Sequence, residues 1–349
     1  IKKVIGTEEL RFGRTIDAGL NILTGMMSHL KETHEKVLSG IEAFKLNDTF
    51  GFPLDLTREI AAEAGFAVDE AAFHIEMTKQ RERARAERLA KDISGWSADL
   101  FGELTAETTR FDGYETLSEK AKVLALSDGE ELVDAIATDE AGEVKDGVLV
   151  VLNHTPFYAE MGGQVADHGY LVSGDAKLKV TQVKKTPKGY FVHTCELLDG
   201  TIHVDDEVTA SVDEKRRAAI CRNHTATHLL QKALREVLGE HVHQAGSYQD
   251  DHITHFDFTH FSAVTPAELA EVERRVNEKI YEALPVTVQN LPIEEAKKMG
   301  AMALFGEKYG SVVRVVDAGG WSTEFCGGTH VTNTAQIGCF KILSESSVA

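Results

Sequence analysis

The sequence has few cysteines and no long apolar run, and both absences exclude whole classes of protein. Four cysteines in 349 residues are too few for a scaffold held together by disulfides. No apolar run approaches the roughly 18 residues that a transmembrane helix needs, and no secretory signal peptide is visible. We therefore expect a cytoplasmic protein without a membrane partner, whose reduced thiols are free to bind metal.

Positive charge is also scarce. Lysine and arginine total 37 against 56 aspartates and glutamates, which gives a formal net charge of −19. This balance argues against a protein whose whole surface binds nucleic acid. It does not exclude a local basic groove, because affinity follows the charges that face the phosphates.

Three patterns follow one another along the chain and predict an α+β fold. Residues 1–104 have helical periodicity, and residues 105–215 contain short β-rich runs separated by turn residues. The evenly spaced runs predict a small antiparallel β-barrel or sandwich. Residues 216–349 mix amphipathic helices with strands and predict an α+β metal-binding core.

Local signals refine this division. Thr265, Pro266 and Glu268 form the pattern of a capping box at the start of a helix. "SVVRVVDA" and "IGCFKILS" near the end of the chain are predicted strands. Because the chain opens at Ile1 and stops just after the second of these runs, we expect it to be an internal fragment of a longer protein.

Two short motifs carry the chemistry. "HTATHLL" (residues 224–230) places His224 and His228 one helical turn apart, so both imidazoles point the same way. "EFCGGTH" (324–330) adds Cys326 and His330, and its two glycines allow a bend that turns both side chains inward. Three imidazoles and a thiolate form a ligand set of the softness that Zn²⁺ prefers.

The role of this metal stays open at the level of sequence. Four protein ligands are typical of a structural zinc site, whereas a catalytic zinc keeps one position open. Thr225, Ala226 and Thr227 separate the two histidines, so the glutamate of a zincin protease is absent. The cytidine-deaminase signature is absent as well.

These motifs resemble a known family. "HTATHLL" with "CGGTH" resembles the editing domain of alanyl-tRNA synthetases, threonyl-tRNA synthetases and free-standing deacylases. "TPFYAEMGGQVADHG" (155–169) and "HQAGSYQDDHITHFDFTH" (243–260) resemble the alanyl branch. "LSGIEAFKLNDTFGFPLDLT" (38–57) resembles the helical tRNA-recognition region of alanyl-tRNA synthetases, which a free-standing deacylase would be expected to lack.

The resemblance implies an editing hydrolase. Its zinc ligands would be His224, His228, Cys326 and His330, and its substrates would be Ser-tRNA(Ala) and Gly-tRNA(Ala). Gln244 and Thr227 match pocket positions that contact the aminoacyl group or position water; the alternatives are a loop glutamine and a helix-surface threonine. With Cys326, they are the predicted catalytic residues. No carboxylate in these motifs is an obvious general base.

The resemblance also implies tRNA(Ala) as partner, bound by its acceptor stem and 3′ end. Asp48 or Asp55 would accept a hydrogen bond from a guanine amine in the shallow groove of A-form RNA. For Asp55 the alternative is an ordinary helix N-cap. Arg216, Arg217 and Arg222 would contact phosphates.

The resemblance leaves three readings open. Nothing in the sequence resembles the ATP-binding motifs of class II synthetases, so we expect no alanine activation, and no oligomeric state follows. The main interpretation is a zinc-dependent deacylase with an attached tRNA-binding region. The alternatives are a tRNA-binding module with a purely structural zinc, and an interaction protein without RNA.

Overall fold

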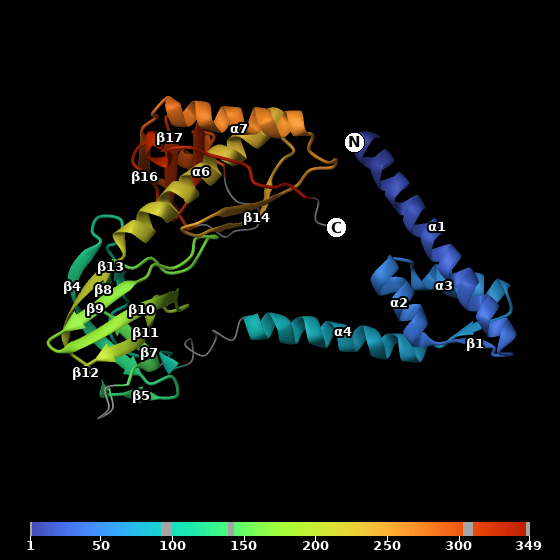
Figure 1. Ribbon diagram of the computed structural model, residues 1–349, viewed down its shortest axis with the longest axis horizontal. Helices are drawn as coiled ribbons and strands as arrows, with labels where there is room; N and C mark the ends of the chain where they lie inside the picture. Colours follow the sequence, from blue (N-terminus) through green and yellow to red (C-terminus); the bar gives the residue numbers. More distant parts are fainter. Residues whose placement is uncertain (1, 92–99, 103, 139–142, 303–309, 347–349) are drawn as a thin grey trace. The chain divides into compact units, whose positions relative to one another are not determined.

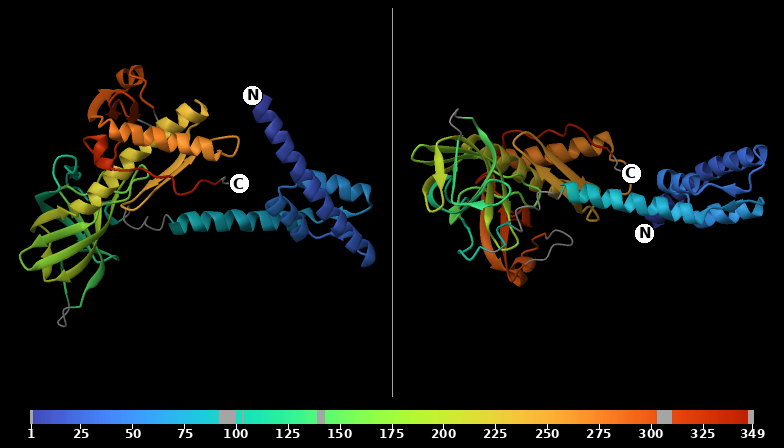
Figure 2. Two further views of the ribbon diagram at one scale, coloured as in Figure 1. Left: turned by 45° about the horizontal axis from the view of Figure 1, so that its top comes forward. Right: turned by 90° about the horizontal axis from the view of Figure 1, so that it is seen from below.

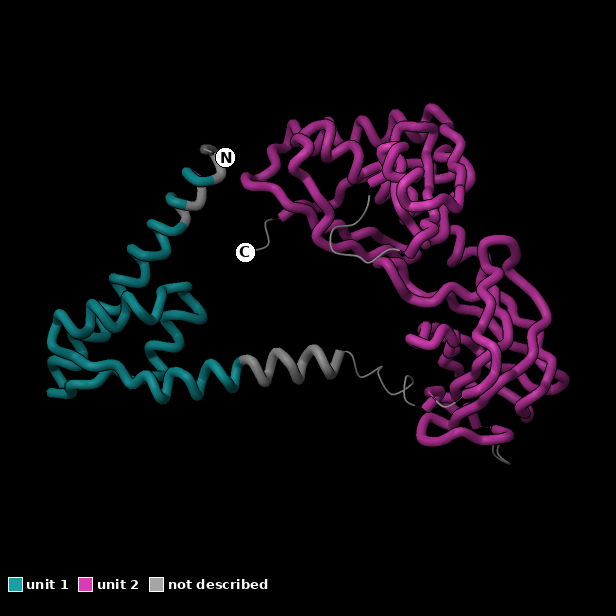
Figure 3. Tube along the Cα trace, turned by 180° about the vertical axis from the view of Figure 1, so that it is seen from behind, with its two compact units in different colours: residues 1–96 teal, residues 97–349 magenta. Residues whose placement is uncertain are grey.

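The computed structural model describes residues 2–91, 100–102, 104–138, 143–302 and 310–346 (Figures 1 and 2). The chain divides into two compact units, residues 1–96 and residues 97–349 (Figure 3). None of the described helices is both long and apolar enough to cross a bilayer.

Unit 1 is helical, as its sequence predicts. Its described helices and strands are α1 (Lys2–Glu32), α2 (Gly40–Phe50), α3 (Leu54–Glu63), α4 (Glu70–Lys91), β1 (Val37–Leu38) and β2 (Ala67–Val68). The two strands pair in parallel. Leu23, Leu46 and Phe52 are fully buried and hold α1 and α2 together with the turn that follows α2.

Asp55 does not cap α3. The helix begins at Leu54 with Pro53 at the N-cap, so Asp55 already lies in the first turn. Its carboxylate accepts a hydrogen bond from Arg58 at 3.1 Å. A negative charge in the first turn is favourable because it faces the positive end of the helix dipole. The N-cap interpretation of Asp55 was therefore wrong, by two positions.

The first part of unit 2 is a closed β-barrel. Its strands are β3 (Arg110–Phe111), β4 (Ser118–Ser127), β5 (Leu132–Val133), β6 (Ala135–Ala137), β7 (Lys145–Leu152), β8 (His154–Thr155), β9 (Gly169–Ser173), β10 (Ala176–Lys185), β11 (Phe191–Asp199), β12 (Thr201–His203) and β13 (Glu207–Val212). The main sheet runs β13-β9-β10-β11-β7-β4-β5 and closes because β13 also pairs antiparallel with β4. Closure leaves no long free edge. The predicted antiparallel barrel is confirmed.

Alternating side chains fill the barrel. Val148, Val150 and Leu152 of β7 point inward and are fully buried, as are Leu178 and Val180 of β10. Residues two apart on a strand lie on the same face, so every second side chain of these strands enters the barrel.

The rest of unit 2 is an α+β core. Its elements are α6 (Glu214–Leu238), β14 (Gln244–Gln249), β15 (Thr254–Phe258), α7 (Pro266–Tyr281), β16 (Val286–Pro292), α8 (Ile293–Lys298), β17 (Val312–Ala318), β18 (Ser322–Phe325) and the short 3-10 helix η2 (Thr334–Ile337). Helices α6 and α7 pack together, β14 and β15 form a hairpin, and β16, β17 and β18 form an antiparallel sheet (Figures 1 and 2).

Two of the predicted local signals are confirmed here and one is wrong. The strand predicted for "SVVRVVDA" is β17. Thr265 and Glu268 make both hydrogen bonds of the capping box, and Pro266 is the first residue of α7. The strand predicted for "IGCFKILS" is absent from the described residues. Instead of a neighbouring strand, the side chain of Asn277 on α7 hydrogen-bonds both the backbone N–H and the backbone carbonyl oxygen of Phe340. Backbone groups satisfied in this way need no partner strand.

The described residues of unit 2 include an apolar cluster in the barrel, one under α6 and α7, and a smaller one of Ala296, Val313, Val315 and Phe325. Helix α6 begins at Glu214, with the side chain of Asp213 as its N-cap. The predicted boundary between residues 215 and 216 falls in the first turn of this helix. The finer division of the chain into three domains stays a prediction.

Candidate metal centre

Helix α6 presents two histidines to one site. The ring centroids of His224 and His228 are 5.3 Å apart, as expected for residues one helical turn from each other. Both rings are buried. Leu229 and Leu234 of the same helix are buried in the apolar cluster shared with α7, so the direction of the two imidazoles is fixed.

The loop after β18 brings Cys326 and His330 to this pair. The Sγ atom of Cys326 lies 3.4 Å from Nε2 of His224 and 3.3 Å from Nε2 of His330. One ligating atom from each of the four residues lies within 4.8 Å of all the others. The four residues that the sequence assigns to one site are therefore neighbours, and they could hold a metal ion.

Gly328 lies at a bend and is also required for space. A Cβ atom at this position would lie 2.1 Å from Cε1 of His224 and 2.8 Å from Oε1 of Gln164. Neither Gly327 nor Gly328 has a positive φ. The chain bends at Gly328, as predicted, and the backbone there must also approach the His224 ring closely.

Burial keeps the three histidines neutral. Loss of solvent lowers the pKa of His224 to about 3. It also lowers the pKa values of His228 and His330 well below the usual range, and neighbouring histidines and Arg314 act in the same direction. A neutral imidazole has a free lone pair, which is the form that binds metal. At pH 7 the group is a set of ligands rather than a cluster of cations.

Hydrogen bonds orient several of these groups. Nδ1 of His224 lies 2.8 Å from Oε1 of Gln164, and Nδ1 of His330 lies 3.1 Å from Oγ1 of Thr225. The backbone N–H of Gly328 donates to Sγ of Cys326 at 3.3 Å. Such contacts fix ring orientation and tune the basicity of metal ligands.

Glu324 is a candidate residue of the metal centre that the sequence motifs did not predict. Its side chain is buried, and its Oε2 lies 3.7 Å from Nε2 of His228. Burial raises the pKa of this carboxyl to about 8, although a hydrogen bond from Ser322 opposes the shift. Both groups are then neutral at pH 7, so their contact is not an ion pair. The signal was present: Glu324 precedes Cys326 by two residues, which puts both on one face of an extended chain.

Gln244 lies at the start of β14 and is half-buried. Its Nε2 donates to Oγ of Ser247 at 3.1 Å. Ser247 packs in turn against Gly163, where a Cβ atom would lie 2.4 Å from the same hydroxyl. Gly163 precedes Gln164, which contacts His224, so Gln244 is linked to the metal centre through a short chain of neighbours.

Thr227 is buried on α6. Its hydroxyl donates to the backbone oxygen of Asn223 at 2.9 Å and lies 3.0 Å from Oγ1 of Thr254. Thr227 therefore ties α6 to β15 rather than lying on the helix surface. The predicted roles of Gln244 and Thr227 in a substrate pocket stay predictions.

A cavity of about 600 Å³ opens beside His330. Cys221, Thr329 and His330 line it, together with Arg222 and Arg314. Neither Gln244 nor Thr227 is among its lining residues.

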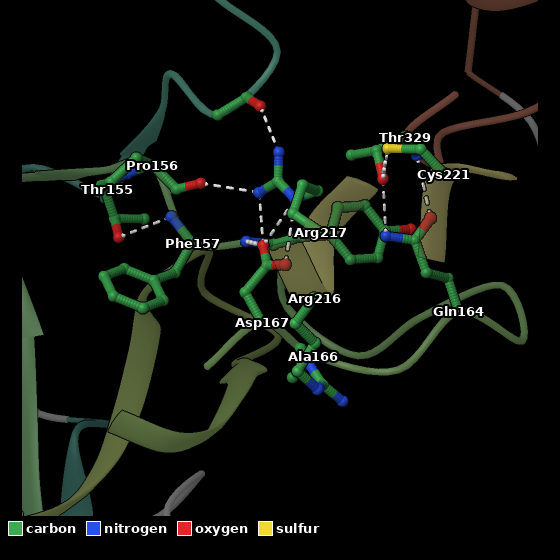
Figure 4. A network of polar contacts seen from close by, with 12 residues as sticks. Thr155, Pro156, Phe157, Gln164, Ala166, Asp167, Arg216, Arg217, Cys221 and Thr329 are labelled. Carbon is green, nitrogen blue, oxygen red and sulfur yellow. Dashed lines mark hydrogen bonds and ion pairs between the residues drawn. The ribbon is translucent and has the colours of Figure 1, made fainter. Parts of the chain in front are cut away.

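Arg217 is held in a buried network (Figure 4). Its Nε donates to both carboxylate oxygens of Asp167, at 2.9 and 3.0 Å. Its terminal nitrogens donate to the carbonyl oxygens of Gly113 and Pro156 at 2.7 and 2.9 Å. All three guanidinium nitrogens are thus used within the protein. This arrangement argues against a phosphate contact by Arg217 and in favour of a structural role.

The other residues that are predicted to contact tRNA differ in how exposed their side chains are. Arg216 donates to the backbone oxygen of Ala166 at 2.6 Å and pairs with Asp251 at 3.2 Å, whereas Arg222 lines the cavity. In unit 1, Asp48 is exposed and accepts a hydrogen bond from Gln80, and the side chain of Asp55 is 79% exposed. Their contacts with RNA stay predictions.

Comparison with known proteins places this site in a family. The model for class II (A) tRNA synthetases matches residues 1–216, and the model for the second additional domain of threonyl and alanyl tRNA synthetases matches residues 313–349. The chain is 49% identical to an alanine–tRNA ligase of Acetivibrio thermocellus, 50% to one of Thermoanaerobacter sp. (strain X514) and 47% to one of Bacillus mycoides. The chain belongs to the alanyl-tRNA synthetase family.

This result confirms the resemblance seen in the motifs. Each of these matches covers 100% of the chain but 39% of the relative. The chain therefore spans about 39% of the length of the alanine–tRNA ligases that it matches. The family model for class II (A) tRNA synthetases covers the helical unit and the barrel. Because of this match, the expectation that the chain does not activate alanine stays a prediction.

Proposed function

We propose that this chain is the tRNA-recognition and editing part of an alanine–tRNA ligase, and that its metal centre hydrolyses Ser-tRNA(Ala) and Gly-tRNA(Ala). The observation that carries this proposal is the group of His224, His228, Cys326 and His330, of which the two helical histidines are buried and the other two residues half-buried. Membership of the alanyl-tRNA synthetase family supports it.

The donor set supports zinc as the metal. Three neutral imidazoles and one thiol suit the tetrahedral nitrogen and sulfur coordination of Zn²⁺ better than that of Mg²⁺ or Ca²⁺, which prefer oxygen. When bound, Zn²⁺ would supply Lewis acidity to an ester carbonyl or to a water molecule. Burial of His224, His228 and Glu324 excludes bulk water from their side of the centre.

The need for such a site follows from the amino acids themselves. A pocket that accepts alanine cannot strongly reject glycine, which only lacks a methyl group, or serine, which adds one hydroxyl. Binding alone discriminates between such pairs by about 10- to 200-fold. A second site that hydrolyses the wrong product raises the accuracy beyond this limit.

The chain's own side chains would then divide the work. Hydrolysis breaks the bond between the aminoacyl carbonyl carbon and the ribose oxygen; water supplies a hydroxyl to the amino acid and a proton to the ribose. Gln244 would bond the serine hydroxyl, because its amide both donates and accepts. Thr227 would hold the hairpin that carries Gln244 against α6, through Thr254. The protonated carboxyl of Glu324 would keep His228 oriented.

Unit 1 would supply recognition of the acceptor stem. The exposed carboxylates of Asp48 and Asp55 are available to accept a hydrogen bond from a guanine amine in the shallow groove. Arg222, at the cavity beside His330, is the best placed of the three predicted arginines to contact a phosphate near the 3′ end.

One observation favours a second candidate function. All four neighbouring ligands come from the protein, and four protein ligands are typical of a structural zinc that keeps no open position. On this reading the chain binds tRNA but does not hydrolyse the ester.

The deciding experiment measures release of serine from Ser-tRNA(Ala) by this chain, with Ala-tRNA(Ala) as the control substrate. Zinc content is determined on the same sample. Selective release of serine with about one zinc per chain is the result expected for an editing hydrolase.

Bound zinc and firm tRNA binding without hydrolysis would instead establish the binding module with a structural metal. Absence of zinc from the folded chain would overturn the proposed metal centre.

A further inference from the structure

Gln164 is fully buried, and its side-chain amide faces Thr329 (Figure 4). It follows the Gly162–Gly163 turn in the segment that connects β8 to β9. Its Oε1 lies 2.8 Å from Nδ1 of His224 and accepts a hydrogen bond from the backbone N–H of Thr329 at 2.9 Å. Its Nε2 donates to Oγ1 of Thr329 at 2.9 Å. A single amide thus joins the barrel segment to a metal ligand and to the loop that carries two more.

The orientation of this amide is set by chemistry. A backbone N–H can only donate, so the atom of Gln164 that faces the N–H of Thr329 must be the oxygen. The same oxygen faces Nδ1 of His224, and an amide oxygen can only accept. Nδ1 of His224 must therefore carry the proton.

This assignment fixes the other end of the ring. A neutral imidazole with its proton on Nδ1 has its lone pair on Nε2. Nε2 of His224 is the atom that lies 3.4 Å from Sγ of Cys326, inside the group of four ligands. Gln164 thus points the lone pair of His224 at the place where a metal would bind.

The ring has little freedom to escape this arrangement. On one side the backbone of Gly328 approaches so closely that a Cβ would lie 2.1 Å from Cε1 of His224. Gln164 is itself anchored, because Val165 donates to the backbone oxygen of Gln249 and Gln249 donates to that of Gly163. The barrel segment and β14 therefore hold the amide in place.

We propose that Gln164 is a positioning residue of the metal centre: it selects the Nδ1-protonated tautomer of His224 and locks the Cys326–His330 loop, which makes the barrel segment part of the site. This inference rests on the proposed metal centre and adds a residue from outside its two motifs. Removal of such an outer partner commonly weakens metal binding by about 10- to 100-fold.

The test uses three variants of the full chain. Gln164→Met removes the acceptor and keeps the length of the side chain. Gln164→Glu keeps an oxygen that accepts from both His224 and Thr329. Gln249→Met is the matched control, because Gln249 is equally buried and its side-chain amide has no hydrogen-bond partner among the described residues.

Two readouts follow, one with metal and one without. Zinc affinity is measured by competition with a chromophoric chelator, after circular dichroism has established that each variant is folded. The tautomer of His224 is read by nitrogen NMR of the histidine side chains in the metal-free chain.

We expect Gln164→Met to weaken zinc binding by about 10- to 100-fold and to shift the proton of His224 away from Nδ1. Gln164→Glu should retain the Nδ1 tautomer and most of the affinity, and Gln249→Met should match the parent in both. If Gln164 had a merely structural role, zinc binding would weaken equally in Gln164→Glu and in Gln164→Met.

The outcomes separate this inference from the proposed function. A parent chain that binds zinc, with unchanged affinity and tautomer in Gln164→Met, would overturn the role of Gln164 and leave the metal centre intact. A parent chain that binds no zinc would overturn the metal centre. In that case an unchanged tautomer in metal-free Gln164→Met would overturn the inference as well, and a shifted one would support the orienting contact.

Discussion

Two regions of unit 2 combine an arginine–aspartate pair with histidine and further ligating groups, and they differ in burial. In the first, Arg217 pairs with Asp167 close to the Gln164–His224 contact, and both side chains of the pair are at most 6% exposed. In the second, at the barrel surface, Arg110 pairs with Asp112 beside Glu119 and His154. Ligating atoms of Asp112, Glu119 and His154 also lie within 4.8 Å of one another.

The difference shows that proximity of ligating atoms does not by itself make a metal site. His224, His228 and His330 are held neutral by burial, and His224 and His330 each have a hydrogen-bonding partner on Nδ1. At the barrel surface, Arg110 already engages both oxygens of Asp112, and its side chain is 72% exposed. There the cationic partner Arg110 competes for the carboxylate of Asp112, which a metal would need.

The largest expected effect is at the buried centre. Cys326→Ala removes the only thiol of the ligand group, so zinc content should fall from about one per chain to near zero. Deacylation of Ser-tRNA(Ala) should fall by at least about 100-fold, as expected when a positioned metal is lost. Elemental analysis and serine release measure both. Cys339→Ala, which alters an exposed cysteine, is the control and should match the parent; full activity of folded Cys326→Ala would break the assignment of the site.

Burial should also separate the two ion pairs. Arg217→Met leaves the carboxylate of Asp167 buried without its partner, and such a change commonly costs about 3–5 kcal/mol of stability. The free energy of unfolding in urea measures it. Arg110→Met, at an exposed pair, should give a much smaller change. Equal losses in the two variants would mean that burial does not distinguish the pairs.

A third contrast is between two histidines of the barrel. His193 is fully buried, and loss of solvent lowers its pKa to about 4, whereas the side chain of His154 is 22% exposed. Between about pH 6.5 and pH 4 the unfolded chain binds a proton at this position that the folded chain does not. The contribution of His193 to stability is therefore present above pH 6.5 and is lost as the pH falls, by about 3 kcal/mol in total.

Urea unfolding at several pH values measures this loss. His193→Gln removes the titrating group, so its free energy of unfolding should depend less steeply on pH over the same range, whatever its absolute stability. If the free energy of unfolding depended equally steeply on pH in His193→Gln and in the parent, the proposed contribution of His193 would be wrong.

The smallest effect is expected at the surface cluster. His154→Asn should leave zinc content and serine release at the level of the parent, because the group at the barrel surface is an ion-pair cluster rather than a metal site. A second zinc per chain in the parent that disappears in His154→Asn would instead show that the half-buried group of Asp112, Glu119 and His154 binds metal.

Much of the fold could be predicted from local pattern, and each failure has an identifiable physical cause. The capping box at Thr265 and the β-rich runs were reliable because they depend on neighbours in the sequence. The strand predicted for "IGCFKILS" failed because Asn277, more than sixty residues earlier, bonds the backbone of Phe340. Asp55 was misplaced because helix boundaries shift by a residue or two with little change in pattern.

The site shows the same division. His224, His228, Cys326 and His330 could be grouped from residue type and spacing alone. Glu324 could have been found from its alternation with Cys326, but its importance depends on burial, which spacing does not reveal. Arg217 looked like a phosphate contact in a basic run, and only its partners, Asp167 and the carbonyl oxygens of Gly113 and Pro156, indicate a structural role.

The sequence by itself determined the ligand types, the helical turn between two of them, the barrel strands and the family. These features need only residue chemistry and the periods of helix and strand. Tertiary structure decided which polar groups lose water and which partners they meet. The pKa values of the histidines, the proton on Nδ1 of His224 and the closed network around Arg217 all depend on contacts between distant residues, because desolvation and hydrogen bonding are set by what surrounds a group in space.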